Sequence, residues 1–215
     1  MEVTEHMQMG MLGNLYVKAA QNKLPNGTDL NGFIHQTDNQ YAYNDGDGST
    51  YYDVEYPIQL GSFDSAFHDA SENTQPLPFA LMKDNYPMIN GRVILDTADS
   101  RTDTFPVAAG SQAGRILIIP SFPPASRSVL ITADAGDKVL LRISNLAITR
   151  FYTLQSLGIP MKAGCKDAKL LRSTDGMKDL YYTTNSVTLG GGESYDVIPI
   201  PQGLRQAPIF SMPLT

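Results

Sequence analysis

Few side chains in this 215-residue sequence could carry chemistry, and their neighbours restrict it further. All three histidines lie at or before residue 68: His6, His35 and His68. His68 has nearby carboxylates at Asp64 and Asp69, but a histidine–carboxylate pair without a nucleophile is not a hydrolase triad. The single cysteine, Cys165, has no histidine beside it, so we interpret it as an incidental thiol. His35 lies in a polar stretch, and we expect it to be chemically inert.

A second candidate is the acidic stretch Asn44–Gly48, which resembles the start of a calcium-binding loop. An EF-hand loop needs glycine at its sixth position and glutamate at its twelfth. Counted from Asp45, these positions hold Thr50 and Tyr56. The spacing therefore predicts a turn at Asp45 and Asp47 rather than a calcium site.

Strand patterns surround these residues. Val139, Leu141 and Ile143 alternate with more polar neighbours, which predicts a strand with one buried face. Further strands are expected in the ranges 53–61, 149–157, 185–189 and 194–198, and a short strand leading into a turn is expected at 86–91; Gly, Pro and Asn residues separate them. Pro57 favours an edge position for the first of these. The expected core residues are Val139, Leu141, Ile143, Phe151 and Leu154. Strands at this spacing predict an all-β sandwich.

The same stretches resemble the plastocyanin-like (cupredoxin) domains of multicopper oxidases. The resemblance rests on Gly-Asp-Lys-Val-Leu-Leu-Arg-Ile-Ser-Asn-Leu (136–146), Thr-Arg-Phe-Tyr-Thr-Leu-Gln-Ser-Leu-Gly-Ile-Pro-Met (149–161) and Tyr-Tyr-Thr-Thr-Asn-Ser-Val-Thr-Leu-Gly-Gly-Gly-Glu-Ser-Tyr-Asp-Val-Ile (181–198). It covers roughly residues 41–198, with a weaker central patch, and the first twenty residues. It implies a Greek-key β-sandwich, here incomplete, preceded by the last strand of another cupredoxin domain.

The first twenty residues resemble the closing motif of a copper-binding cupredoxin domain. In that motif, a His-Cys-His triplet is followed by a further histidine and then, five residues later, by an axial ligand. A thiolate and two imidazoles bind copper trigonally, with a weak axial thioether. The resemblance implies that His6 and Met11 are type 1 copper ligands, and that Leu12, Leu15 and Val17 belong to the closing strand. The triplet itself is absent. The alternative for His6 is a surface or capping histidine.

The family's pattern is also missing elsewhere. In a copper-binding cupredoxin, the strand at 151–157 would carry histidines at alternate positions. Thr153, Gln155 and Leu157 occupy those positions here. The second domain therefore resembles the structural middle domain of the family, which separates copper-bearing neighbours.

Both ends depart from the family. Met1-Glu-Val-Thr-Glu-His6 resembles an internal sequence of the relatives, so we expect the chain to begin inside a larger gene. The Pro-rich tail replaces an expected strand and fits a frame slip near Ile198; a natural Pro-rich terminus is the alternative. The expected organisation is a closing strand at 1–20, a linker at 21–48, a second plastocyanin-like domain without copper ligands at 49–198, and an aberrant tail at 199–215.

Composition limits the partners. A net charge of −6 with scattered basic residues argues against nucleic acid, and no apolar run approaches the length of a membrane span. The remaining cupredoxin domains of the parent are the expected partners, and oligomerisation is left open. The parent family is periplasmic or secreted, although the sequence shows no signal peptide.

The resemblance implies a parent enzyme that takes single electrons from a reductant and reduces oxygen to water at copper centres. With only His6 and Met11 as inherited ligands, we expect this chain alone to hold no copper and to be inactive. The alternative is a non-enzymatic β-sandwich binding or assembly module.

Overall fold

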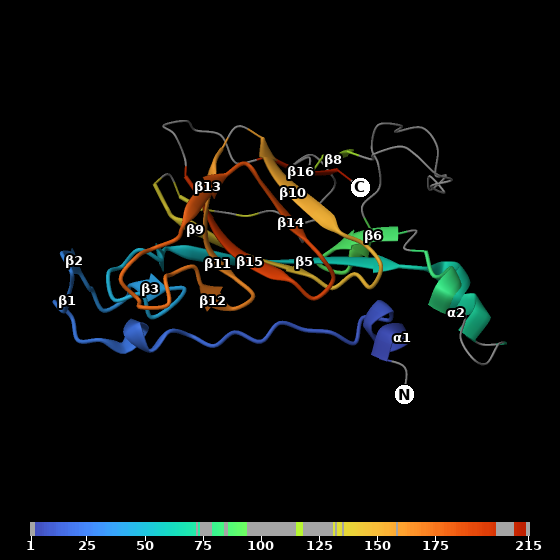
Figure 1. Cartoon of the computed structure of the whole chain (residues 1–215), viewed down its shortest axis with the longest axis horizontal. Coiled ribbons are helices and arrows are strands. Elements are labelled where there is room, and N and C mark those ends of the chain that lie inside the picture. The colour runs from blue at the N-terminus through green and yellow to red at the C-terminus, as the bar shows by residue number, and fades with distance from the viewer. Residues whose placement is uncertain are drawn as a thin grey trace.

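The computed structural model describes residues 3–71, 73, 79–83, 86–93, 115–117, 131, 133–134, 136–157, 159–200 and 209–213. These residues form two main sheets, two short hairpins and a few short helical segments, so the all-β prediction is confirmed (Figure 1). The sequence predicts a loop with one short strand at 111–127, and within this range the structure describes only Arg115–Leu117.

The larger sheet has the strand order β12-β11-β15-β9-β5-β6-β7, and β13 pairs with β11 beside this path. Its strands are β5 (Val54–Phe63), β6 (Tyr86–Ile89), β7 (Arg92–Val93), β9 (Val139–Asn145), β11 (Met161–Lys166), β12 (Lys169–Leu170), β13 (Tyr182–Thr184) and β15 (Ser194–Pro199). The β5–β9 pair is parallel, with Val54 opposite Val139 and Leu60 opposite Asn145. Strand β9 thus lies between β5 and β15.

The smaller sheet has the order β14-β10-β16-β8. Its strands are β8 (Arg115–Leu117), β10 (Tyr152–Leu157), β14 (Ser186–Leu189) and β16 (Ile209–Pro213). Residues of both sheets share one apolar core, which makes this a β-sandwich. The fully buried members include Ile58, Leu60, Leu141, Ile143, Tyr152, Leu154, Met161 and Leu189.

The remaining elements belong mainly to the N-terminal part of the chain. They are α1 (Val3–Gln8), a 3-10 turn at Ala20–Lys23, β1 (Asp29–Leu30), β2 (Phe33–Ile34), β3 (Gln40–Tyr41), β4 (Tyr51–Tyr52), α2 (Ser65–Ser71) and a 3-10 turn at Phe79–Leu81. Residues 19–52, called the N-terminal module below, have a small core of their own around Ala19, Leu30 and Tyr41. Short strands in this module stand where the sequence predicted a polar linker.

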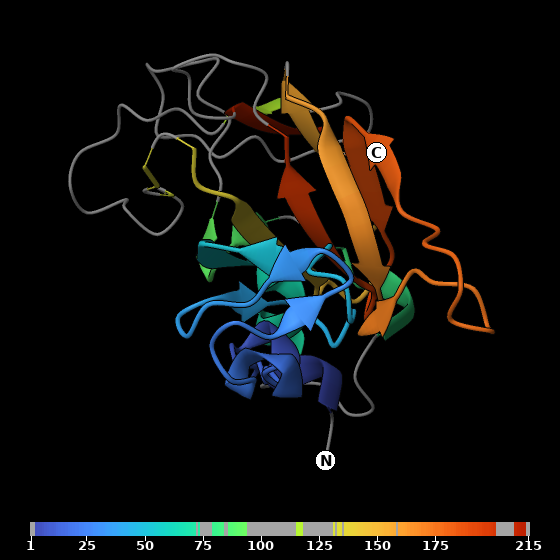
Figure 2. The same cartoon turned by 90° about the vertical axis from the view of Figure 1, so that its left-hand side faces the viewer.

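The N-terminal module covers the outer face of the larger sheet, on the side opposite the smaller sheet (Figures 1 and 2). Leu140 of β9 is 1% exposed because it packs against Ala42 and Tyr52 of the module. The sequence predicted only one buried face for this strand. The second face is buried too, because a separate segment of the chain covers it.

The core prediction was correct for Leu141, Ile143 and Leu154, and Val139 packs against the same cluster while partly exposed. It was wrong for Phe151, whose side chain is 63% exposed, because β10 begins only at Tyr152. Strand β5 pairs with β9 over Val54–Leu60 and with β6 over Leu60–Phe63, so Pro57 lies in the half of β5 that is paired on one side only, as a proline favours.

The two ends also differ from expectation. The predicted strand around Leu12, Leu15 and Val17 is absent: α1 is followed by an irregular segment in which Leu15 is 91% exposed. In the tail, Ile209–Pro213 form β16, which pairs with β10 and β8 despite ending in proline. A proline can close a strand where its missing N–H is not required by the ladder.

Turn chemistry explains how the strands connect. Asp45 is buried and its carboxylate accepts the backbone N–H groups of Asp47, Gly48 and Thr50, at 3.1, 2.9 and 2.7 Å. The predicted turn is therefore confirmed.

The turn between β14 and β15 requires glycine. A Cβ on Gly191 would lie 2.5 Å from the carbonyl oxygen of Ala147, so only glycine fits there.

The core assignment can be tested with one pair of substitutions. Leu141→Ala should lower the free energy of unfolding by about 2–5 kcal/mol, because it leaves a cavity between the two sheets. Phe151→Ala, next to the same sheet but mostly exposed, should cost less than about 1 kcal/mol. Urea unfolding followed by circular dichroism measures both. Equal losses in the two variants would show that the inward face has been misidentified.

Candidate functional site

The two residues that resemble copper ligands lie at the end of a short helix. His6 is half-buried in the last turn of α1, and Met11 is 70% exposed just beyond it. The backbone N–H of Met11 donates to the carbonyl oxygen of His6 at 2.9 Å, which closes the helix end. His6 and Met11 are therefore separated by the last turn of a helix. The resemblance had implied that this segment leads directly into a strand.

The other two histidines have structural partners. The Nε2 atom of His68 on α2 lies 3.0 Å from the side-chain oxygen of Gln8 on α1, and its ring stacks on Phe63 with 4.5 Å between centroids. His35 is fully buried in the N-terminal module, with its Nδ1 atom 2.9 Å from the Tyr41 hydroxyl. His35 was expected on a polar loop. The ring of Tyr41 on β3 lies 5.6 Å from that of His35, and the polar residues around His35 in the sequence gave no sign of its burial.

Cys165 lies on β11 and is 2% exposed. Burial, together with the neighbouring Asp196 carboxylate, raises the pKa of its thiol, and a hydrogen bond with Tyr43 only partly offsets this. The thiolate is the form of cysteine that binds metals and attacks electrophiles. Cys165 is therefore held as a neutral thiol.

A partly buried charge cluster lies between the larger sheet and the N-terminal part of the chain; it comprises Lys18, Tyr43, Tyr52, Glu55, Arg142 and Asp196. At its centre, Arg142 on β9 donates from Nε to Glu55 at 3.1 Å and from Nη1 to Asp196 at 3.2 Å. These two carboxylates come from β5 and β15, the strands on either side of β9. The cluster therefore ties together the three central strands of the larger sheet.

The N-terminal part of the chain supplies the rest of the cluster. The Tyr43 hydroxyl donates to Asp196 at 2.7 Å, the Tyr52 hydroxyl donates to Glu55 at 3.1 Å, and the Lys18 ammonium group forms an ion pair with Glu55. The Arg142 guanidinium also lies over the ring of Tyr16, 5.1 Å from its centroid. Sequence analysis missed this cluster. The sequence feature that could have revealed the cluster is the presence of charged residues, Glu55, Arg142 and Asp196, within otherwise apolar strands.

The pKa values of the two carboxylates shift in opposite directions. Burial raises the pKa of Asp196, although Arg142 and Tyr43 oppose the shift. Burial would also raise the pKa of Glu55, but hydrogen bonds from Lys18 and Arg142 hold it below its ordinary value of 4.5. Glu55 is thus stabilised as an anion in the folded protein. The contacts of its carboxylate with Lys18 and Arg142 therefore stabilise the fold.

The described residues do not fit a type 1 copper centre. Among them, no three His, Cys, Asp or Glu side chains are grouped so that they could hold a metal ion. On β10, the inward positions are filled by Tyr152 and Leu154, and Thr153 on the other face shares a hydrogen bond with Thr188 at 2.8 Å. These side chains of β10 pack in the core and link neighbouring strands.

Comparison with known proteins gives structural matches only. No family model and no curated protein matches the sequence. The laccase from Botrytis aclada is 21% identical over 70% of this chain and 23% of its own, with a TM-score of 0.43. The blue copper oxidase from Nitrosomonas europaea is 16% identical over 69% of this chain and 33% of its own, with a TM-score of 0.42.

The chain thus spans about a quarter to a third of the length of these solved structures. A third solved structure, the multicopper oxidase mgLAC, is 17% identical over 69% of this chain and 33% of its own, with a TM-score of 0.43. No helix among the described residues is long and apolar enough to cross a membrane.

The charge cluster predicts a specific pH dependence. Because the pKa of Glu55 is lowered in the folded state, its contribution to stability is fully present above pH 4.5 and is lost as the pH falls through the folded-state pKa. The difference in unfolding free energy between the wild type and Glu55→Gln should therefore be largest near neutral pH and shrink in acid. Denaturant titrations at a series of pH values measure it. A difference that is constant or grows as the pH falls would contradict the assignment.

Proposed function

We propose that this chain is a structural β-sandwich domain of a multicopper oxidase, together with a segment that packs against it. The proposal rests first on the stretches at 136–198 that resemble the family's plastocyanin-like domain. In the structure they form β9, β10, β13, β14 and most of β15, and most of these strands contribute to one shared core.

The observation that carries the scaffold role is the filling of this core. Its inward positions are occupied by tightly buried apolar and aromatic side chains, such as Leu141, Tyr152 and Leu154. The one cysteine is buried beside Tyr43 and Asp196, in the contact between the larger sheet and the N-terminal module. A domain built this way supports neighbours by its shape and surface, while the copper ions of the parent are held elsewhere.

The finer assignments are part of the same proposal. The parent would oxidise a reductant by single electrons and reduce oxygen to water, and its other cupredoxin domains would be the partners of this one. His6 and Met11 are proposed as ligands only within such a parent. The division into 1–20, 21–48, 49–198 and 199–215, and a periplasmic or secreted location, are likewise proposed from the resemblance.

Copper titration of the purified chain tests the scaffold role. Because a type 1 centre needs a thiolate ligand and the Cys165 thiol is buried and neutral, Cu(II) should produce no intense visible absorption band and no oxygen consumption with a phenolic reductant. The matched control is Cys165→Ser, which should behave as the wild type does. An intense band that disappears in Cys165→Ser, or oxidase turnover, would overturn the proposal.

The genomic DNA upstream of the Met1 codon tests the link to a larger oxidase. We expect to find in-frame codons for His-Cys-His directly before this codon. A stop codon in that frame with no such set would favour the standalone binding module instead.

A further inference from the structure

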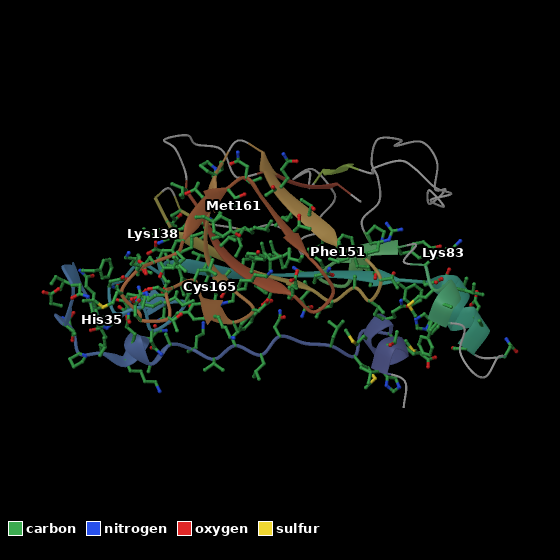
Figure 3. The ribbon with its side chains drawn as sticks, viewed as in Figure 1. His35, Lys83, Lys138, Phe151, Met161 and Cys165 are labelled. Carbon is green, nitrogen blue, oxygen red and sulfur yellow. The ribbon has the colours of Figure 1, made fainter. Side chains whose placement is uncertain are left out.

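A cavity of about 180 Å³ lies where the N-terminal module meets the larger sheet. The module contributes Ser49 and Tyr51, and the sheet contributes two lysines, Lys138 just before β9 and Lys162 on β11. Figure 3 labels Lys138 at the end of the sandwich nearest to the module. The rest of the lining is the apolar run Ile198, Pro199 and Ile200 at the end of β15.

The two ammonium groups are positioned by contacts that leave donors free. Lys162 Nζ donates to the carbonyl oxygen of Ser49 at 2.8 Å and lies 4.3 Å from the ring centroid of Tyr181. Lys138 Nζ lies 5.2 Å from the ring centroid of Tyr51. An ammonium group has three N–H donors. Within the described part of the chain, neither lysine forms an ion pair.

The nearby carboxylates are already engaged with other groups. Arg172 pairs with Asp47 at 2.8 Å and with Asp179 at 2.7 Å. Asp53 accepts the backbone N–H of Lys138 at 2.8 Å and the hydroxyl of Tyr51. These acidic side chains therefore have hydrogen-bonding partners, and Lys138 and Lys162 are the charged residues that line the cavity itself.

The ammonium group of Lys162 is partly desolvated. Burial lowers the pKa of its ammonium group, against the raising effect of Asp179 and Asp47, and Lys138 adds to the lowering. A carboxylate placed between the two lysines would offset both the desolvation and the like-charge repulsion. Such hydrogen bonds between charged groups are stronger than those between neutral groups.

We propose that this cavity binds a small carboxylate with a compact apolar body, about the size of one aromatic ring. The carboxylate is held by Lys138 and Lys162, and the apolar body lies against Ile198, Pro199 and Ile200. An apolar cavity of about 150 Å³ accommodates benzene, so the volume suits a single ring. This binding site goes beyond the scaffold role, because a structural domain does not require it.

The probe is benzoate, titrated into the full chain and followed by calorimetry and NMR shifts. Benzoate should bind saturably in the millimolar range or tighter. Benzamide, which has the same shape without the charge, and acetate, which lacks the ring, should each bind at least about tenfold more weakly. Lys162→Met should weaken benzoate binding about tenfold or more, and Lys138→Met should also weaken it. Lys169→Met, which removes an exposed lysine outside the cavity, should leave it unchanged.

Three results would overturn the proposal. They are no saturable benzoate binding, benzamide binding as tightly as benzoate, and unchanged affinity in Lys162→Met. Inorganic phosphate binding as tightly as benzoate would refute the apolar half of the site. The benzoate–benzamide comparison uses the wild type only, so it decides the question even if a lysine variant fails to fold. Failure here leaves the copper titration of the scaffold role unaffected.

Discussion

The buried guanidinium of Arg142 constrains the rest of this structure. A charged group taken out of water is costly unless it is paired and hydrogen-bonded. Glu55 and Asp196 flank Arg142 from the two neighbouring strands and pair with its Nε and Nη1 atoms, while its buried Nη2 atom has no hydrogen-bond partner among the described residues. Those carboxylates are in turn bonded by Tyr52, Tyr43 and Lys18, which come from the N-terminal part of the chain. Removing one partner would leave a buried charge without compensation.

This constraint divides β9 into two working faces. Leu141 and Ile143 point into the sandwich, while Leu140 and Arg142 meet the N-terminal module and the segment before it. The apolar face stabilises the sandwich by burying side chains in its core. The polar face determines which segment packs on the outer side of the sheet, because its ion pairs and hydrogen bonds need specific partners. A single strand therefore holds the smaller sheet on one side and the module on the other (Figure 2). The proposed carboxylate site lies at this same junction.

Much of the sandwich could be predicted from alternating residue types. The pattern at 139–143 identified β9, and the strands predicted at 53–61, 185–189 and 194–198 correspond to β5, β14 and β15. Predictions failed where burial depends on distant segments. Leu140 appeared to lie on an exposed face because its partners, Ala42 and Tyr52, are about a hundred residues away.

Resemblance to the family was a weaker guide at the ends of the chain. Leu15 and Val17 suggested a strand, yet they are exposed beyond a short helix, since a strand needs a neighbour to pair with. The proline-rich tail suggested no strand, yet Ile209–Pro213 pair with β10. The charge cluster was missed because ion pairs between β5, β9 and β15 depend on register, which composition does not reveal.

Hydrogen exchange on Arg142→Met, compared with the wild type, tests this account most directly. If Arg142 holds the module to the sheet, backbone amides at 40–55 should lose protection strongly in the variant. Those at 152–156 and 187–189, in the smaller sheet, should lose little. Unchanged protection at 40–55, or an equal loss in both regions, would show that the module and the sandwich do not depend on this guanidinium.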